Sequence, residues 1–188
     1  NYSDFERKIH LSYVPLPGGE AAIKEPWRTA IAYLTVFLGN EGKKYIDLFF
    51  RNHDTKVVQE MIAQRFNTPL ACGCGRLFDT VSALLGICLE NTYEGQAAIE
   101  LAELVRKNTQ RRSLTPYGYE IEGDTIMPGK IISGIIHDRL EGVPLQIISE
   151  RFHLTLVTII CEAVQRVYSE CGIKRVVLSG GTWHNQYL

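Results

Sequence analysis

The most informative part of the chain is Val176-Val-Leu-Ser-Gly-Gly-Thr-Trp-His-Asn-Gln-Tyr-Leu188. Its β-branched beginning, residues 175–178, predicts a buried strand, and the Ser-Gly-Gly sequence at 179–181 predicts a tight turn into a helix. Backbone N–H groups freed at such a turn, beside the positive end of a helix, suit an anion and usually a phosphate. The segment therefore predicts an α/β protein with a phosphate-binding turn at its two glycines.

Both ends of the chain look like internal points of a longer sequence. Residues 5–14 read like the end of a strand or hairpin already under way. The chain stops seven residues after Gly181, before a helix could complete two turns. We therefore expect residues 1–188 to be a partial domain that is truncated at both ends.

Composition limits the class of protein. The 188 residues are 45% hydrophobic, which suffices for one large or two small domains, and the formal net charge is −1. The nearest approach to a basic stripe, residues 106–112, is interpreted as the solvated end of a helix running into a loop. The first residues do not resemble a signal peptide, and no apolar run reaches the roughly 20 residues that cross a bilayer. We expect neither a nucleic-acid nor a membrane partner.

The cysteines and histidines argue against a metal site or a disulfide framework. The five cysteines are irregularly spaced, Cys72-Gly-Cys74 is too tight for the usual zinc knuckle, and the five histidines include no HxxxH pair. Reduced thiols in a cytoplasmic protein explain this pattern better than disulfides do. The sequence thus predicts no metal ligands within this chain and a cytoplasmic location.

The apolar spacing predicts a helix-rich chain. Turn residues at 15–20 predict a loop, and residues 117–126 alternate like a hairpin with its turn at Glu122-Gly-Asp124. The segment 154–160 is β-branched enough for a strand, but the helical period on both sides favours a helix. Helices are predicted over residues 26–38, 44–52, 54–66, 75–85, 96–105, 128–141 and 144–171.

Three segments combine a glycine at an element boundary with a nearby polar side chain. Together they resemble a nucleotide cleft, in which glycines admit close backbone approach and a carboxylate binds ribose hydroxyls. Each glycine alone could equally be a helix cap, and Asp79 could be a surface carboxylate on its helix. The candidate site residues are Gly75, Arg76, Asp79, Glu94, Gly95, Gly180, Gly181 and Asn185.

Two histidines lie near these segments. His153 falls on the apolar stripe of the longest helix and is interpreted as a satisfied core or hinge residue. His184 could reach a ligand or be turned away by helical geometry. The spacing of the residues identifies no catalytic dyad and no magnesium cluster.

The order and spacing of five motifs resemble the HypF family, the carbamoyltransferases of [NiFe]-hydrogenase maturation. The resemblance covers essentially all 188 residues. The motifs are Leu16-Pro-Gly-Gly-Glu20 with Glu25-Pro-Trp-Arg28, Gly75-Arg-Leu-Phe-Asp79, Tyr93-Glu-Gly-Gln-Ala97, Arg151-Phe-His153, and Leu178-Ser-Gly-Gly181 with Asn185.

This resemblance implies a helix-rich α/β part of an actin-like (ASKHA, RNase H-like) two-lobed domain. It also implies a protein that makes carbamoyl adenylate from carbamoyl phosphate and ATP. The carbamoyl group would pass to the C-terminal cysteine of a partner, HypE, where dehydration yields the nitrile that becomes a cyanide ligand. The metal ion implied for the intact domain would have its ligands outside this chain, and so would the zinc finger of the parent protein.

By the same resemblance, Asp79 matches the carboxylate that holds the nucleotide ribose, and Gly95 matches a glycine against the nucleoside. Gly180 and Gly181 match the turn beside the phosphates, and Asn185 matches the asparagine after it. Arg28 and Arg76 match family arginines of unassigned role.

The sequence also departs from the family pattern. Ala71-Cys-Gly73 stands where a Thr-Ser-Ser-like run is usual, and Thr182-Trp-His-Asn185 replaces a Val-Phe-Gln-Asn continuation. The histidine-rich metal motif and a later Asp-Gly-Gly segment lie outside residues 1–188. We therefore expect the chain alone to be inactive.

Two alternatives remain open. One is an O-carbamoyl or threonylcarbamoyl transferase of the same fold, the latter disfavoured by the Glu94-Gly-Gln96 loop and the lack of a basic surface. The other is a non-catalytic lobe that docks a partner, with its glycine turns serving only as helix caps.

Overall fold

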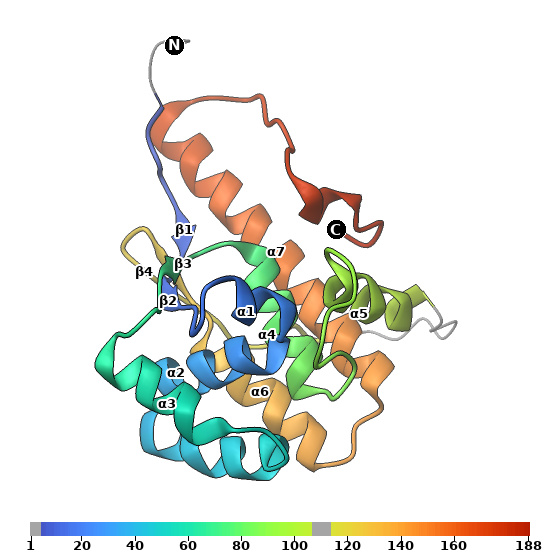
Figure 1. The fold of residues 1–188 in the computed structure, drawn as a ribbon. Coiled ribbons are helices and arrows are strands. Elements are labelled where there is room, and N and C mark those ends of the chain that lie inside the picture. Colours follow the sequence, from blue (N-terminus) through green and yellow to red (C-terminus); the bar gives the residue numbers. More distant parts are fainter. Residues whose placement is uncertain (1–4, 107–113) are drawn as a thin grey trace.

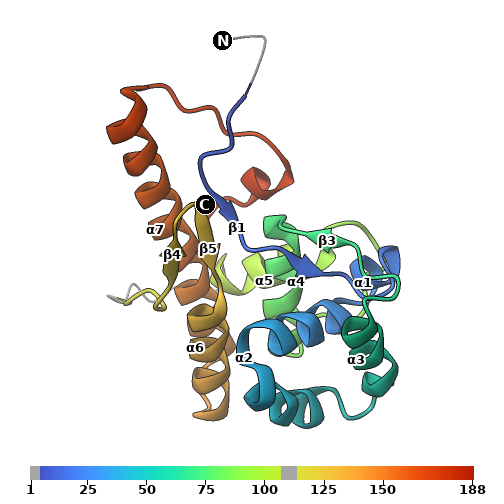
Figure 2. The same ribbon diagram turned by 90° about the vertical axis from the view of Figure 1, so that its left-hand side faces the viewer.

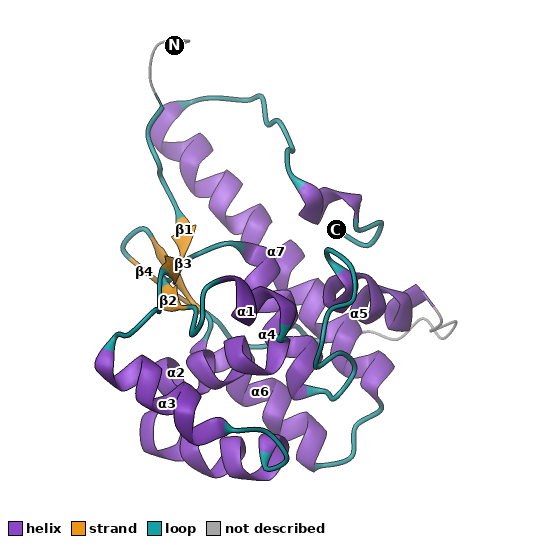
Figure 3. Ribbon diagram, in the orientation of Figure 1, coloured by secondary structure: helices purple, strands orange, loops and turns teal. Residues whose placement is uncertain are grey.

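Helices form most of the molecule, with two small sheets at one side (Figures 1 and 3). The computed structural model describes residues 5–106 and 114–188. The elements in chain order are β1 (His10–Leu11), β2 (Val14–Pro15), α1 (Glu20–Lys24), α2 (Pro26–Phe50), α3 (Thr55–Gln64), β3 (Leu70–Ala71), α4 (Cys74–Leu84), α5 (Gln96–Arg106), β4 (Glu120–Glu122), β5 (Thr125–Met127), α6 (Gly129–Leu140), α7 (Leu145–Cys171) and the 3-10 turn η1 (Gly181–His184).

Helix α4 lies at the centre of the helical layer. It packs against α2 on one side and α5 on the other, while α5 also packs against α7 (Figures 1 and 2). Every residue of α4 from Leu77 to Leu84 is buried. The largest buried side chains come from α2, α4 and α7, and include Tyr33, Phe78 and Phe152. The candidate carboxylate Asp79 therefore sits on the most enclosed helix of the fold.

The two sheets are short. β1 pairs in parallel with β5, which pairs with β4 in antiparallel orientation, and β2 pairs with β3. The predicted hairpin at 117–126 is confirmed, with Ile121 opposite Ile126 and Gly123 in the turn at φ 63°. The strand or hairpin expected over residues 5–14 is reduced to β1 and the first residue of β2.

The two helices expected over 26–38 and 44–52 form one helical run with a kink. Pro26 occupies the first turn of α2, as expected for a residue without an N–H, and Gly39 adopts φ 52° at the kink. A Cβ on Gly42 would lie 2.2 Å from the carbonyl oxygen of Leu34, so only glycine allows the second half to fold back this closely.

Helix α3 begins as the sequence predicts. The Asp54 carboxylate accepts a hydrogen bond from the Val57 N–H at 3.5 Å, which makes Asp54 the N-cap. The short helix α1 was not predicted, because the turn residues before it suggested only a loop. Its N-cap Gly19 has φ 58°, a conformation that glycine adopts readily.

Helix α7 confirms the helical reading of residues 144–171. Ile148, Phe152 and Leu156 recur at intervals of four and are all buried in the core. The alternative strand over 154–160 is therefore wrong, and the helix ends where Gly172 adopts φ 67°.

The strand predicted over residues 175–178 is wrong. These residues have no regular secondary structure, and the Val177 side chain is 88% exposed. Within the part of the chain that the structure describes, no strand pairs with them. The helix expected after Gly181 is the single 3-10 turn η1.

Three further expectations concern a membrane span, the basic run and the cysteines. No helix among the described residues is long and apolar enough to cross a membrane. The basic run 106–112 lies outside the described residues except for Arg106, which ends α5. All five cysteines are free thiols.

Candidate functional site

Asp79 is the buried carboxylate of the site. Only 3% of the residue is exposed, so the interpretation as a surface carboxylate is wrong. Arg76 Nη2 lies 3.0 Å from Asp79 Oδ2 one helical turn away, as an ion pair without hydrogen-bond alignment. Burial raises the pKa of this carboxyl to about 6, although Arg76 and the amide of Asn91 act to lower it.

Three buried polar atoms of α4 have no hydrogen-bond partner in the structure. They are Arg76 Nη1, Asp79 Oδ2 and Ser82 Oγ, from residues three apart along one side of the helix. Buried polar groups are normally paired, because an unpaired one costs about 1–3 kcal/mol. This side of α4 therefore carries unused capacity for hydrogen bonds to a polar ligand. Sequence analysis missed Ser82, since it matches no motif.

Asn91 connects Asp79 to the neighbouring elements. Its Nδ2 donates to the carbonyl oxygen of Ile23 in α1 at 2.8 Å, and its Oδ1 accepts from the Ala97 N–H in α5 at 3.1 Å. The same side chain helps to lower the Asp79 pKa. Asn91 was also missed, because an isolated asparagine before a helix gives no sequence signal of its contacts.

The loop before α5 places Glu94 and Gly95 at the surface. Gly95 adopts φ 77°, so the glycine is required by the backbone of the turn. The Gln96 side chain closes the loop, since its Oε1 accepts hydrogen bonds from the Thr92 N–H and hydroxyl at 2.7 and 2.9 Å. The beginning of α5, just after Glu94 and Gly95, is linked to Asp79 through Asn91, which accepts from the Ala97 N–H.

The Gly180–Gly181 turn lies against the beginning of α4. Gly180 adopts φ 97°, both glycines are exposed, and Gly181 begins η1. The next residue, Thr182, hydrogen-bonds the Cys74 thiol at the first position of α4, where burial raises the Cys74 pKa to about 11. This contact brings the turn to the helix that carries Gly75, Arg76 and Asp79.

The Asn185 side chain forms a hydrogen bond with the buried His153 ring. Its Nδ2 lies 2.9 Å from His153 Nε2, and its Oδ1 accepts from the Tyr187 N–H at 3.0 Å. The His153 ring packs at 5.5 Å from the ring of Phe78, the residue before Asp79. The expectation that His153 is a satisfied core residue is confirmed.

The structure thus gathers the three predicted segments around α4. The remaining candidates lie apart: His184 is exposed, and Arg28 pairs with Glu25 and stacks over Trp27 at 4.9 Å. Within residues 5–106 and 114–188, no group of three or more His, Cys, Asp or Glu could hold a metal ion.

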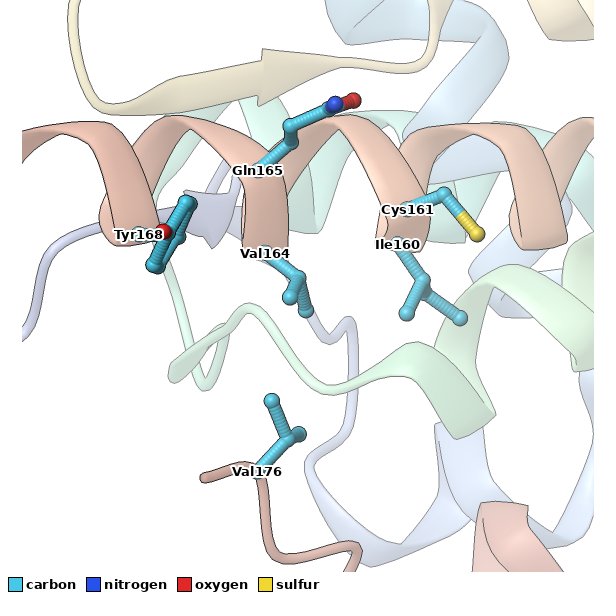
Figure 4. Close-up of a pocket in the computed structure, with 6 residues that line it drawn as sticks. All are labelled: Ile160, Cys161, Val164, Gln165, Tyr168 and Val176. Atoms are coloured by element: carbon cyan, nitrogen blue, oxygen red, sulfur yellow. The ribbon is translucent and has the colours of Figure 1, made fainter. Parts of the chain in front are cut away.

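A separate hollow lies on the C-terminal half of α7. It is lined mainly by apolar side chains, and Figure 4 shows Ile160 and Val164 pointing from the helix toward Val176. Gln165 points the other way (Figure 4). None of the predicted site residues lines this hollow, so it is distinct from the polar site on α4.

Comparison with known proteins identifies the family. The model of the family described as "Carbamoyltransferase, Kae1-like Domain, second subdomain" matches residues 1–188. The chain belongs to the HypF carbamoyltransferase family. The expected fold, a helix-rich α/β part of an actin-like domain, is thereby confirmed.

Relatives and solved structures agree with this assignment. The chain is 32% identical to carbamoyltransferase HypF of Rhizobium leguminosarum bv. viciae over 98% of the chain and 23% of that protein. It is 25% identical to the probable carbamoyltransferase HypF of Methanocaldococcus jannaschii over 97% of the chain and 24% of that protein. The chain therefore spans about a quarter of the length of these HypF relatives.

Two solved HypF structures have the same fold. Full-length HypF in its phosphate- and nucleotide-bound form superposes with a TM-score of 0.87 and 35% identity, covering 98% of this chain and 29% of that one. HypF of T. kodakarensis superposes with a TM-score of 0.83 and 27% identity, covering 97% of this chain and 25% of that one.

Proposed function

We propose that this chain contributes part of the nucleotide site of a carbamoyltransferase, with Asp79 as the ligand of the ribose hydroxyls. The observation that carries the proposal is the buried Asp79 carboxylate, whose Oδ2 has no hydrogen-bond partner on an enclosed helix. A cis-diol can donate two hydrogen bonds to a carboxylate and so satisfy it. Ser82 Oγ and Arg76 Nη1 extend the same polar surface.

The other predicted residues fit around such a nucleotide. Gly180 and Gly181 have no side chains to block close approach of a phosphate to the backbone, and the turn is held beside the first residue of α4. Gly95 leaves the beginning of α5 open to a nucleoside in the same way. A similar full-length HypF structure was determined in a phosphate- and nucleotide-bound form, so nucleotide binding occurs in this family.

The proposed substrate is carbamoyl adenylate, made from carbamoyl phosphate and ATP by the complete protein. The acceptor is the C-terminal cysteine of HypE, in the cytoplasm, in the service of hydrogenase cyanide-ligand synthesis. The thiolate sulfur attacks the carbamoyl carbon and forms the C–S bond. The bond from that carbon to the phosphate oxygen breaks, and AMP leaves with the electron pair.

The residues of this chain would act on that step by binding and orientation. Asp79 would fix the ribose, while backbone N–H groups of the 180–182 turn would stabilise charge that develops on the departing phosphate. No residue of the chain is assigned as the base, since the acceptor thiolate is itself the nucleophile.

The test is carbamoyl transfer by the complete natural polypeptide that carries residues 1–188. Purified HypE, carbamoyl phosphate and ATP are incubated with the wild type, with Asp79→Ala, and with Asp47→Ala as a control from the exposed side of α2. Mass spectrometry of the HypE C-terminal peptide measures thiocarboxamide formation.

We expect product with the wild type and with Asp47→Ala, and at least about tenfold less with Asp79→Ala, the effect of losing hydrogen bonds to a charged group. If the folded wild type makes no thiocarboxamide, the proposed acceptor is wrong. Equal rates of thiocarboxamide formation in all three proteins would show that Asp79 does not contribute to the site.

A further inference from the structure

His153 is fully buried and lies in a chain of hydrogen bonds that crosses three elements. Its Nδ1 lies 2.8 Å from the carbonyl oxygen of Ser149, and its Nε2 lies 2.9 Å from Asn185 Nδ2. The Ser149 hydroxyl donates to the carbonyl oxygen of Leu101 in α5 at 2.7 Å. The chain therefore runs from α5 through α7 to the segment after the Gly180–Gly181 turn.

The partners of His153 fix its tautomer. The Ser149 carbonyl oxygen can only accept, so Nδ1 carries the proton and donates it. In a neutral ring, Nε2 is then an acceptor, which requires the amide nitrogen of Asn185 to face it. This orientation leaves Asn185 Oδ1 to accept the Tyr187 N–H at 3.0 Å. Flipping the amide would set two donors against each other at Tyr187.

Aromatic rings hold the imidazole in place. Phe78 of α4, Phe152 of α7 and Tyr187 lie with their ring centroids 5.5, 5.6 and 5.5 Å from that of His153, each in an edge-to-face arrangement. Because Phe78 is followed directly by Asp79, the packing that fixes His153 also involves the helix turn that carries the candidate ribose ligand.

The segment that reaches Asn185 has little other support. Residues 172–180 are exposed throughout, and Gly180 adopts φ 97°, a conformation open to glycine. Beyond it, contacts to the body of the molecule include Thr182 on Cys74, Asn185 on His153, the Tyr187 hydroxyl on Glu150 of α7, and the packed side chains of Tyr187 and Leu188. The bond from Asn185 ends on a side chain, His153, that is fully buried.

We propose that His153 is a positioning residue of the nucleotide site, which as a neutral imidazole holds the Asn185 amide and thereby the Gly180–Gly181 turn against α4 and α7. The expected effect on nucleotide affinity rests on the proposed function. The link itself is a property of the protein without nucleotide.

Hydrogen–deuterium exchange of the complete natural polypeptide without nucleotide tests the link. The variants are His153→Phe, which keeps a buried ring but no acceptor, and Asn185→Ala, which removes the donor. His153→Gln restores an acceptor near the position of Nε2, and His137→Gln on the exposed side of α6 is the matched control. The peptide covering 180–188 reports the turn, and a peptide from α4 reports the fold.

We expect exchange in the 180–188 peptide to become about five- to tenfold faster in His153→Phe, as for the loss of one hydrogen bond. Asn185→Ala should be at least as fast, because it also removes the acceptor of the Tyr187 N–H. The double variant should be no faster than Asn185→Ala alone, because that substitution already removes the bond to His153. His153→Gln should recover part of the protection. Unchanged exchange in Asn185→Ala, or additive effects in the double variant, would overturn the proposal.

Two readouts separate this inference from the proposed function. If exchange in the α4 peptide also becomes faster in His153→Phe, that variant has changed the fold. The exchange rates of Asn185→Ala and His153→Gln then decide whether the link between His153 and Asn185 exists. ADP titration into the same proteins measures the consequence, with an expected affinity loss of about five- to tenfold in His153→Phe and less in His153→Gln. Wild-type protein that binds no ADP refutes the proposed function, whereas the exchange result still decides the link.

Discussion

Replacing Asp79 by asparagine should stabilise the chain at neutral pH while weakening its proposed function. Burial raises the pKa of this carboxyl from 3.8 to about 6, and this net shift already includes the opposing effects of Arg76 and Asn91. When the pKa of a carboxyl is raised by folding, the stability it contributes is present below its unfolded-state pKa and is lost as pH rises through its folded-state pKa. A shift of about two pKa units corresponds to about 3 kcal/mol.

The assay is urea unfolding of the wild type and Asp79→Asn at about pH 7.5 and about pH 4, with the difference in free energy of unfolding compared at each pH. We expect the variant to be more stable by up to about 3 kcal/mol at the higher pH and by close to zero at the lower one. Asp47→Asn, at an exposed position of α2, should change stability by less than about 0.5 kcal/mol at both.

One result would refute this reasoning. If Asp79→Asn is less stable than the wild type at about pH 7.5, the ion pair with Arg76 outweighs the cost of burying the carboxylate. The carboxylate would then be held for stability, and its buried oxygen would no longer point to a ligand.

Three further changes test the packing around the site. Gly42→Ala places a Cβ 2.2 Å from the Leu34 carbonyl oxygen and should lower the free energy of unfolding by about 1–3 kcal/mol or more, whereas an unchanged urea midpoint would contradict the kink geometry. Asn91→Ala should cost about 1–3 kcal/mol through the loss of its hydrogen bonds to the Ile23 carbonyl oxygen and the Ala97 N–H, measured in the same way, and an effect below about 0.5 kcal/mol would argue against its bridging role. Tyr117→Phe removes a 2.7 Å hydrogen bond to the Asp138 carboxylate and should lower the thermal midpoint, with a cost of about 1.5–3 kcal/mol; a midpoint equal to that of the wild type would be inconsistent with that bond.

Most of the helices were predictable because their signals are local. Apolar residues at intervals of three and four define α7 even through the β-branched stretch at 154–160, and Asp54 is a cap that acts within its own helix. The hairpin was predictable for the same reason, since its alternation and its turn at Gly123 lie within a few residues.

The absence of a strand at 175–178 was not predictable, because strand formation depends on a partner elsewhere in the chain. Its β-branched residues have the right local propensity, yet Val177 is 88% exposed.

The candidate site, too, was predictable from the sequence only in part. The glycine turns and Asp79 could be selected by their place at helix boundaries and by family resemblance, but the burial of Asp79 follows from the packing of α4 between α2 and α5. Asn91 and Ser82 left no signal, because their importance comes from contacts between elements that are distant in sequence. The contact between His153 and Asn185 joins residues 32 positions apart and is visible only in three dimensions.

The central claim is that Asp79 binds the nucleotide, and isothermal titration of ADP tests it most directly. The complete natural polypeptide is titrated as the wild type, as Asp79→Ala and as Asp47→Ala. The account predicts saturable binding by the wild type and Asp47→Ala, with affinity about ten- to a hundredfold lower in Asp79→Ala, as for the loss of hydrogen bonds to a charged group. Equal affinity in Asp79→Ala, or no binding by a folded wild type, would contradict it and favour a lobe that only docks a partner.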